Sequence, residues 1–261
     1  MSYTKSELIK DIQNMGLKKE DALMVHSSFK SIGEVDGGAD TVVDAFMEYF
    51  KDGLLMMPTH TWKQMGENYP VFDPKSEDGC VGIIPNRFRI REGVVRSLHP
   101  THSIAAYGPA AEEYVKGEEY LHTPCDPSGC WGRLADVHAK ILLLGVTHIR
   151  NTYIHAIEEI YDVPGRLTDK PVQFFVQMPD GTKKEVMMHR HYSPKTPHIS
   201  ESFDKMLEGY FKTGACKEVR FGDAKCILCD AKKLLEVTGK ILAKEPGCFL
   251  DCETIPTKWY E

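Results

Sequence analysis

The sequence contains no apolar run as long as the ~20 residues that a membrane-spanning helix needs. We therefore expect no membrane partner. Basic residues are not in excess either: 32 Lys and Arg stand against 38 Asp and Glu, which gives a formal net charge of −6. Proteins that bind nucleic acids usually carry a basic patch or stripe, so we also expect no nucleic-acid partner. This charge is compatible with a cationic small-molecule substrate.

The sequence also lacks internal repeats, low-complexity segments and linker-like stretches. We therefore expect a single domain over residues 1–261. The first 16 residues predict an amphipathic helix rather than a signal peptide, because Thr4 and Glu7 form a capping box and Gly16 ends the apolar face. Without a signal peptide, the eight cysteines fit a reducing compartment in which they remain thiols. The expected location is the cytoplasm.

Short apolar runs alternate with amphipathic segments through the first 160 residues. Such runs are typical of strands that are buried on both faces of a sheet, and the amphipathic segments predict helices. The expected strands cover 22–28, 53–58, 140–146 and 224–229, and the expected helices cover 37–50, 152–161, 202–214 and 231–243. Residues 172–188 predict a β-hairpin with its turn at 179–181, which breaks this rhythm. The predicted fold is α/β, with three α/β/α layers around a mixed central sheet.

The segment VHSSFKSIG (25–33) places Ser27, Ser28, Lys30 and Gly33 directly after the first expected strand. Hydroxyls, backbone N–H groups and one positive charge can hold phosphates where the backbone forms a nest or begins a helix. Serine-rich turns after strands are more often plain turns. By itself this segment is a weak signal for phosphate binding.

The segment RSLHPTHS (96–103) combines Arg96, which could bind an anion, with two histidines and Ser103. Pro100 biases the backbone of His99 away from the helical region. Taken alone, the segment is more simply explained as a proline-containing loop with solvated histidines.

A third group lies where the strand at 140–146 gives way to a helix. His155 and Glu158 are three residues apart, so they share a helix face. A neutral imidazole can act as a general base, and a carboxylate could orient the ring and stabilise the imidazolium. Taken alone, a His-x-x-Glu pair is more often a surface pair worth a few tenths of a kcal/mol.

The cysteines allow a different class of function. Two pairs, Cys226 with Cys229 and Cys248 with Cys252, could supply the four thiolates of a structural zinc site. Neither pair has an obvious zinc-knuckle turn, and free cysteines are commonly small core residues. Cys125 and Cys130 flank DPSG, and a nucleophilic role for them would require a covalent enzyme intermediate. We expect no metal, and keep a zinc-binding structural protein as the alternative class.

In this order, the segments VHSSFKSIG, MPTHTW, FDP, GIIPNRFRIREGVVRSLHPTHSIAAYG, LLLGV and NTYIHAIEE resemble the aminoglycoside 3-N-acetyltransferase family. The resemblance covers roughly residues 20–165. It implies an α/β/α enzyme, distinct from the GNAT acetyltransferases, that uses acetyl-CoA as co-substrate. The implied reaction acetylates the 3-amino group of a 2-deoxystreptamine aminoglycoside by direct transfer in a ternary complex. The same chemistry on another amine remains an alternative, because the loop at 60–80 and the C-terminal half would form much of the acceptor pocket.

The resemblance also assigns roles to individual residues. His155 matches the catalytic base, Glu158 would orient it, and His99 would lie beside the thioester. The residues implied in acetyl-CoA binding are Ser27, Ser28, Lys30, Gly33, Ile84, Pro85, Arg96, His99 and Ser103. Possible contacts with the acceptor amine are His60, Trp62, Asp73 and Glu159.

Overall fold

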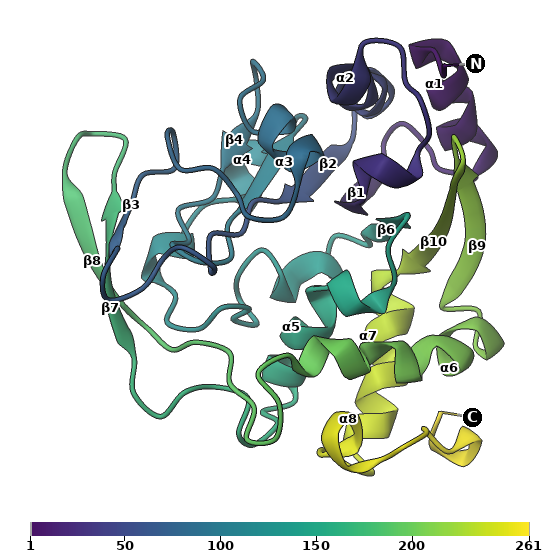
Figure 1. The fold of residues 1–261 in the computed structure, drawn as a ribbon. Coiled ribbons are helices and arrows are strands. Elements are labelled where there is room, and N and C mark those ends of the chain that lie inside the picture. Colours follow the sequence, from purple (N-terminus) through teal and green to yellow (C-terminus); the bar gives the residue numbers. More distant parts are fainter. Residues whose placement is uncertain (1, 261) are drawn as a thin grey trace.

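The computed structural model describes residues 2–260; Met1 and Glu261, which the single-domain prediction includes, lie outside the described residues. Within that range, strands in the order β4-β5-β2-β1-β6-β10-β9 form the central sheet (Figure 1). Their bounds are Ala22–Ser27 (β1), Leu54–Pro58 (β2), Val95–Arg96 (β4), Ile104–Tyr107 (β5), Lys140–Leu144 (β6), Cys216–Phe221 (β9) and Ala224–Asp230 (β10). The strand β1 is parallel to its neighbours β2 and β6. On one side β5 is antiparallel to β2 and to β4, and on the other side β10 is antiparallel to β6 and to β9. The sheet is mixed, as predicted.

Helices cover both faces of this sheet. One face packs against α1 (Lys5–Asn14), α2 (Gly38–Tyr49) and α3 (Ile83–Phe88), and this core includes Val25, Leu55 and Leu142. The other face packs against α5, α6 and α7, and this core includes Met24, Met56 and Leu143. The bounds on this side are Ala111–Tyr114 (α4), Tyr153–Ile160 (α5), Leu207–Lys212 (α6), Ala231–Leu242 (α7) and Cys248–Asp251 (α8). Adjacent strand residues alternate between the two cores, which gives the three α/β/α layers seen in Figure 1.

The predicted hairpin forms, but it does not belong to the central sheet. Its strands β7 (Val172–Gln177) and β8 (Lys183–Met188) are antiparallel, and β7 pairs in parallel with the short β3 (Val71–Phe72). This second sheet lies to the left in Figure 1 and has its own small core around Phe72 and Phe174. The central sheet is mixed because β4, β5, β9 and β10 join it by antiparallel pairs, and the predicted hairpin contributes nothing to it.

The helix boundaries follow local capping. Thr4 and Glu7 form the predicted capping box of α1, and the Asp230 side chain accepts the backbone N–H of Lys233 at the start of α7. The helix expected at 202–214 is divided into a 3₁₀ segment, Ile199–Met206, and α6. Within residues 2–260, no helix is long and apolar enough to cross a bilayer.

Candidate active site

The carboxyl ends of the parallel strands β1, β2 and β6 open onto a cavity of about 1260 Å³. Ligands of α/β proteins usually bind at this edge of the sheet. An ordinary small-molecule site occupies ~300–1,000 Å³, so this cavity is larger than the usual site for one ligand. Its walls come from segments far apart in the sequence, including the turn after β1, the first turn of α5 and residues 190–200.

His155 lines this cavity from α5 and is held from behind by a buried ion pair. Its Nδ1 lies 3.1 Å from Oε2 of Glu158, and Nε of Arg166 donates to Oε1 of the same carboxylate at 2.6 Å. Glu158 is completely buried and Arg166 is 5% exposed, while His155 keeps 15% of its side chain accessible. A carboxylate only accepts hydrogen bonds. Nδ1 must therefore carry the proton, and Nε2 keeps its lone pair.

Aromatic rings fix the plane of the His155 imidazole. The ring of His191 stacks on it with centroids 4.2 Å apart, and Phe203 meets it edge-on at 4.8 Å. Nε2 of His191 lies 3.1 Å from Oε1 of Glu159, which also accepts the backbone N–H of Cys125 at 2.9 Å. Burial holds the pKa of His191 well below its usual value and raises that of Glu159. Glu159 does not line the cavity, so we correct its expected contact with substrate: it positions His191.

Three further histidines on the cavity wall are buried and neutral. Burial lowers the pKa of His26 to about 3, and it holds the pKa values of His60 and His102 well below the usual range. Nε2 of His60 lies 3.0 Å from the Thr152 hydroxyl, while Nδ1 of His60 and Nε2 of His26 have no hydrogen-bond partner among the described residues. The rings of His26 and His60 pack against Trp131. The expected contact of His60 with a ligand is compatible with its position.

Sequence reasoning missed His26, His102 and His191 as cavity residues. His26 could have been found, because it lies near the carboxyl end of the strand predicted at 22–28, and one position before the end of β1 in the structure. His102 stands in the segment 96–103, but nothing in that segment indicated which of its side chains faces the cavity. His191 follows the hairpin and is brought to α5 only by the tertiary fold.

The turn after β1 contributes a hydroxyl and a charge to the cavity. Ser27 and Ser28 line it, as does the exposed Lys30. The Ser27 hydroxyl is buried and has no partner among the described residues, whereas Oγ of Ser28 accepts a hydrogen bond from Ser31. Gly33 does not line the cavity. It has a φ of +89°, and a Cβ there would approach Oδ2 of Asp223 to 2.3 Å. Its role is this close packing, which corrects the predicted phosphate contact.

The start of α3 forms part of an apolar wall. Ile83 and Ile84 line the cavity, and Ile84 is almost completely buried. Pro85 is buried within the helix and does not reach the cavity. Of these two residues, both implied in acetyl-CoA binding by the resemblance, Ile84 lines the cavity and Pro85 does not.

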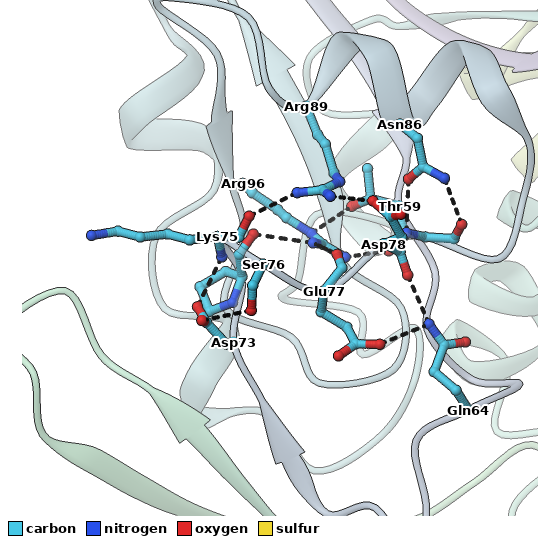
Figure 2. Close-up of polar contacts among 12 residues, drawn as sticks. Thr59, Gln64, Asp73, Lys75, Ser76, Glu77, Asp78, Asn86, Arg89 and Arg96 are labelled. Carbon is cyan, nitrogen blue, oxygen red and sulfur yellow. Dashed lines mark hydrogen bonds and ion pairs between the residues drawn. The ribbon is translucent and has the colours of Figure 1, made fainter.

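Arg96 is a structural residue, which corrects its predicted contact with the cofactor. Figure 2 shows its guanidinium bound to the loop that follows β2. It donates to the carbonyl of Thr59 at 2.8 Å, to that of Pro74 at 3.1 Å and to that of Glu77. Burial lowers the pKa of Arg96 to about 9, so the group stays protonated at neutral pH. Ser103, also predicted to contact cofactor, donates to the same Thr59 carbonyl at 2.9 Å and lies outside the cavity.

His99 is completely buried and uses both ring nitrogens within the fold. Its Nδ1 accepts the backbone N–H groups of Thr101 at 3.2 Å and His102 at 2.9 Å, so Nε2 carries the proton and donates to the carbonyl of Thr123 at 3.1 Å. His99 is not among the cavity residues. With no free nitrogen and no access to the cavity, it cannot contact a thioester in this conformation. We therefore correct both its predicted catalytic role and its predicted cofactor contact.

Acidic side chains of the loop after β2 are used inside that loop (Figure 2). Asp73 accepts the Ser76 hydroxyl at 2.7 Å and the backbone N–H of Lys75 at 3.0 Å, and the Ser76 bond holds its pKa below the usual value. Asp78 pairs with Arg89. Asp73 does not line the cavity, which corrects its expected substrate contact, whereas Trp62 does line it.

The cavity wall has a strongly one-sided charge. The described residues that line it include no Asp or Glu. They include four basic residues, namely Lys30, Lys63, Arg150 and Arg190. Arg190 donates to the carbonyls of Met65 at 2.7 Å and Trp62 at 2.6 Å. The wall is therefore electropositive at neutral pH, and suits anionic groups.

Comparison with known proteins places this site in a family. The family model described as aminoglycoside 3-N-acetyltransferase matches residues 24–243. The chain belongs to this family. Aminoglycoside N(3)-acetyltransferase III of a Salmonella species is 28% identical over 271 positions, covering 94% of this chain and 93% of that protein. Aminoglycoside N(3)-acetyltransferase VIII of Streptomyces fradiae is 31% identical over 181 positions, covering 62% of this chain and 63% of that protein.

Solved structures of acetyltransferases share the fold over nearly the whole chain. Aminoglycoside acetyltransferase AAC(3)-IVa in complex with gentamicin is 26% identical and superposes with a TM-score of 0.81, covering 96% of this chain and 92% of that one. AAC-IIIb, solved as a binary complex with CoASH, is 22% identical with a TM-score of 0.78, covering 90% of this chain and 94% of that one. The mixed α/β/α architecture is therefore that of the aminoglycoside 3-N-acetyltransferases and not that of GNAT enzymes, as the sequence resemblance implied.

The cysteines do not form the four-thiolate site considered as an alternative. Cys226 packs in the core beneath α1 and α2, whereas Cys229 and Cys248 pack in the opposite core beneath α7. Cys125 and Cys130 are buried, and burial raises the pKa of both thiols well above its usual value. They are protonated at neutral pH, which makes them poor nucleophiles.

Proposed function

We propose that this chain is an acetyl-CoA-dependent N-acetyltransferase in which His155 is the general base. The observation that carries the proposal is the arrangement of His155, Glu158 and Arg166 at the cavity wall, with Nε2 of His155 free to accept a proton. An acceptor amine must lose a proton to form an amide. A positioned imidazole that takes this proton typically contributes 10²–10⁴ in rate.

The Glu158 carboxylate would hold His155 in one tautomer and stabilise the imidazolium that forms. Because Arg166 shares the same carboxylate, the buried pair carries no net charge before proton transfer. When His155 accepts a proton, the cluster gains one positive charge next to a fixed negative partner. This arrangement lowers the cost of the step without requiring Glu158 itself to accept the proton.

The cavity also fits coenzyme A, the co-substrate that would supply the acetyl thioester. The unpartnered Ser27 hydroxyl and the cations Lys30 and Arg150 are groups that bind phosphate oxygens, and Ile83 and Ile84 offer an apolar wall for a flexible arm. The cavity exceeds one ordinary ligand site. This size supports direct transfer between two substrates that are bound together.

We propose the 3-amino group of a 2-deoxystreptamine aminoglycoside as the acceptor, because the named relatives are aminoglycoside N(3)-acetyltransferases. The test measures CoA thiol release with acetyl-CoA and gentamicin or apramycin, followed by mass spectrometry of the product. One added acetyl group at position 3 supports the proposal. No acetylation of any amine by the wild-type enzyme would contradict the general function as well as the acceptor.

The charge of the cavity favours a second candidate, the same chemistry on an amine that also carries an anionic group. A polycation would meet four cationic side chains and no carboxylate on the described wall, and like charges brought together in a partly desolvated site repel. Part of this positive charge would serve the coenzyme phosphates. Lys63 and Arg190 lie on the wall near Trp62 and are the ones we assign to the acceptor side.

A charge-reversal experiment separates the two acceptor classes. Lys63 is exposed and lines the cavity, so Lys63→Glu should raise kcat/KM for an aminoglycoside and lower it for an anionic amine. Lys51→Glu makes the same change on an exposed lysine outside the cavity and serves as the matched control. If wild-type kcat/KM is highest for aminoglycosides and Lys63→Glu lowers it, the second candidate is wrong.

A further inference from the structure

A compact group of soft metal ligands lies in the core, outside the cavity. Contrary to our expectation from the sequence that the protein holds no metal, we propose that His148, Cys216 and Cys229 bind a zinc ion. One donor atom from each residue lies within 4.8 Å of the other two. Nε2 of His148 is 3.8 Å from Sγ of Cys216, which is 2.8 Å from Sγ of Cys229. All three side chains are buried, so the three donor atoms lie within the core.

The sheet itself brings the two thiols together. Cys216 and Cys229 face each other across the antiparallel pair β9 and β10. The backbone N–H of Asp230 donates to Ala215, the next pair along, so the cysteine pair is a non-hydrogen-bonded one. In such pairs the Cα atoms approach to ~4.5 Å and the side chains are closest. His148 reaches the same point from the 3₁₀ turn that precedes α5.

Two thiols and an imidazole form a Cys₂His donor set, which holds zinc in known proteins and leaves a fourth tetrahedral position for water or another donor. Tetrahedral Zn–S bonds of ~2.3 Å place two sulfur atoms ~3.8 Å apart. The thiols must therefore separate by about 1 Å, a movement on the scale of a side-chain rotation.

The charge balance also favours the ion. Binding of Zn²⁺ releases one proton from each thiol, so two S–H bonds are replaced by two Zn–S bonds and the net charge of the buried group stays at zero. An uncompensated charge in such a place would be costly. Because a buried site cannot easily be filled after folding, we expect the ion to enter as the chain folds.

The other nitrogen of His148 has a partner that can fix the ring. Nδ1 of His148 lies 3.1 Å from Nδ2 of Asn151, whose Oδ1 accepts the backbone N–H of Tyr153 at 3.3 Å. Zinc requires the lone pair on Nε2, and hence a proton on Nδ1. The Asn151 amide must turn over so that its oxygen accepts the Nδ1 proton, which gives the outer hydrogen bond usual for a zinc-bound histidine. This turn exchanges the 3.3 Å bond from the Tyr153 N–H for the bond to His148. The ion would then tie the β9–β10 hairpin to the turn that leads into α5.

The test uses the full chain, reduced and stripped of metal, refolded with Zn²⁺ and dialysed. We expect one equivalent of zinc by elemental analysis, and its loss in Cys216→Ser and in Cys229→Ser. Cys226→Ser and Cys248→Ser remove buried thiols outside the group and should retain the metal. In case the first two variants do not fold, Cd²⁺ titration of the wild-type protein should give a saturable thiolate-to-metal charge-transfer band at one equivalent.

Three outcomes would overturn the proposal. Reduced wild-type protein could bind no zinc and show no cadmium band. Zinc could still be bound in Cys216→Ser or in Cys229→Ser. It could also be lost equally in the control variants Cys226→Ser and Cys248→Ser. The two thiols could also be found joined as a disulfide in protein that was purified without metal chelators, with no zinc present.

Discussion

Substitution of His155 gives the sharpest test of the proposed mechanism. In His155→Asn the amide nitrogen can take the place of Nδ1 and keep the bond to Glu158, but the side chain cannot accept a proton at neutral pH. The Glu158–Arg166 pair stays intact, so the cost in folding stability should be limited to altered packing of a ring that is 15% exposed. The loss of a general base should lower kcat by about 10²–10⁴, or about 2.7–5.5 kcal/mol in activation free energy.

The assay combines turnover with cofactor affinity. Turnover is followed by release of the CoA thiol, and the affinity for CoA is measured by calorimetry on the same protein preparation. Affinity should change little, because the proton that His155 accepts belongs to the amine. His155→Ala should behave similarly, with an added loss of packing against Phe203. Turnover above about a tenth of wild type in both variants would be too high for a general base, and the base would have to be sought elsewhere on the cavity wall.

Three further variants test other contacts of the site. Glu158→Gln leaves Arg166 buried without a counter-charge, so it should lower the free energy of unfolding by ~3–5 kcal/mol in urea titrations as well as kcat, whereas a loss of kcat alone would contradict this account. Ser27→Ala with Lys30→Ala should weaken CoA binding about 10- to 100-fold in calorimetry, and an unchanged Kd would remove this turn from the cofactor site. The pKa of His26 in the folded protein is depressed to about 3, so below pH ~6.5 the unfolded chain binds a proton that the folded chain does not. Between about pH 6 and pH 4, the unfolding free energy of the wild type should therefore fall by about 1.4 kcal/mol per pH unit through this residue, and His26→Gln should remove that part of the fall. An unchanged slope of unfolding free energy against pH would show this histidine to be solvated.

Much of the architecture could be predicted because its signals are local. Apolar runs marked β1, β2, β6 and β10, and capping residues marked the starts of α1 and α7. The strand β9 was missed because its sequence, CKEVRF, alternates weakly and is buried mainly at its ends. The sequence also did not show which sheet the hairpin belongs to. Its alternation fits any half-buried antiparallel pair, and only the tertiary structure shows that it pairs with β3.

The site was predictable where a side chain follows the carboxyl end of a parallel strand. Ser27 ends β1 and His60 closely follows β2, so both reach the cavity for this reason, whereas His155 reaches it from the helix α5 that comes after β6. The segment 96–103 was misinterpreted because a sequence does not show which way a polar side chain points. Arg96 and His99 have the chemistry of ligand-binding groups, but the buried carbonyls and N–H groups around them need partners within the fold.

These structural residues still shape the chemistry of the cavity. Carbonyl groups of the loop after β2 accept hydrogen bonds from the Arg96 guanidinium, which ties that loop to β4. His99 does the same for the backbone at His102 and thereby aims the His102 ring at the cavity. Two acidic side chains of this loop have other partners: Asp73 accepts the Ser76 hydroxyl, and Asp78 pairs with Arg89. Neither lines the cavity, whereas Lys63 and Arg190 do. Acceptor choice should therefore respond to Lys63 and Arg190 more than to Asp73.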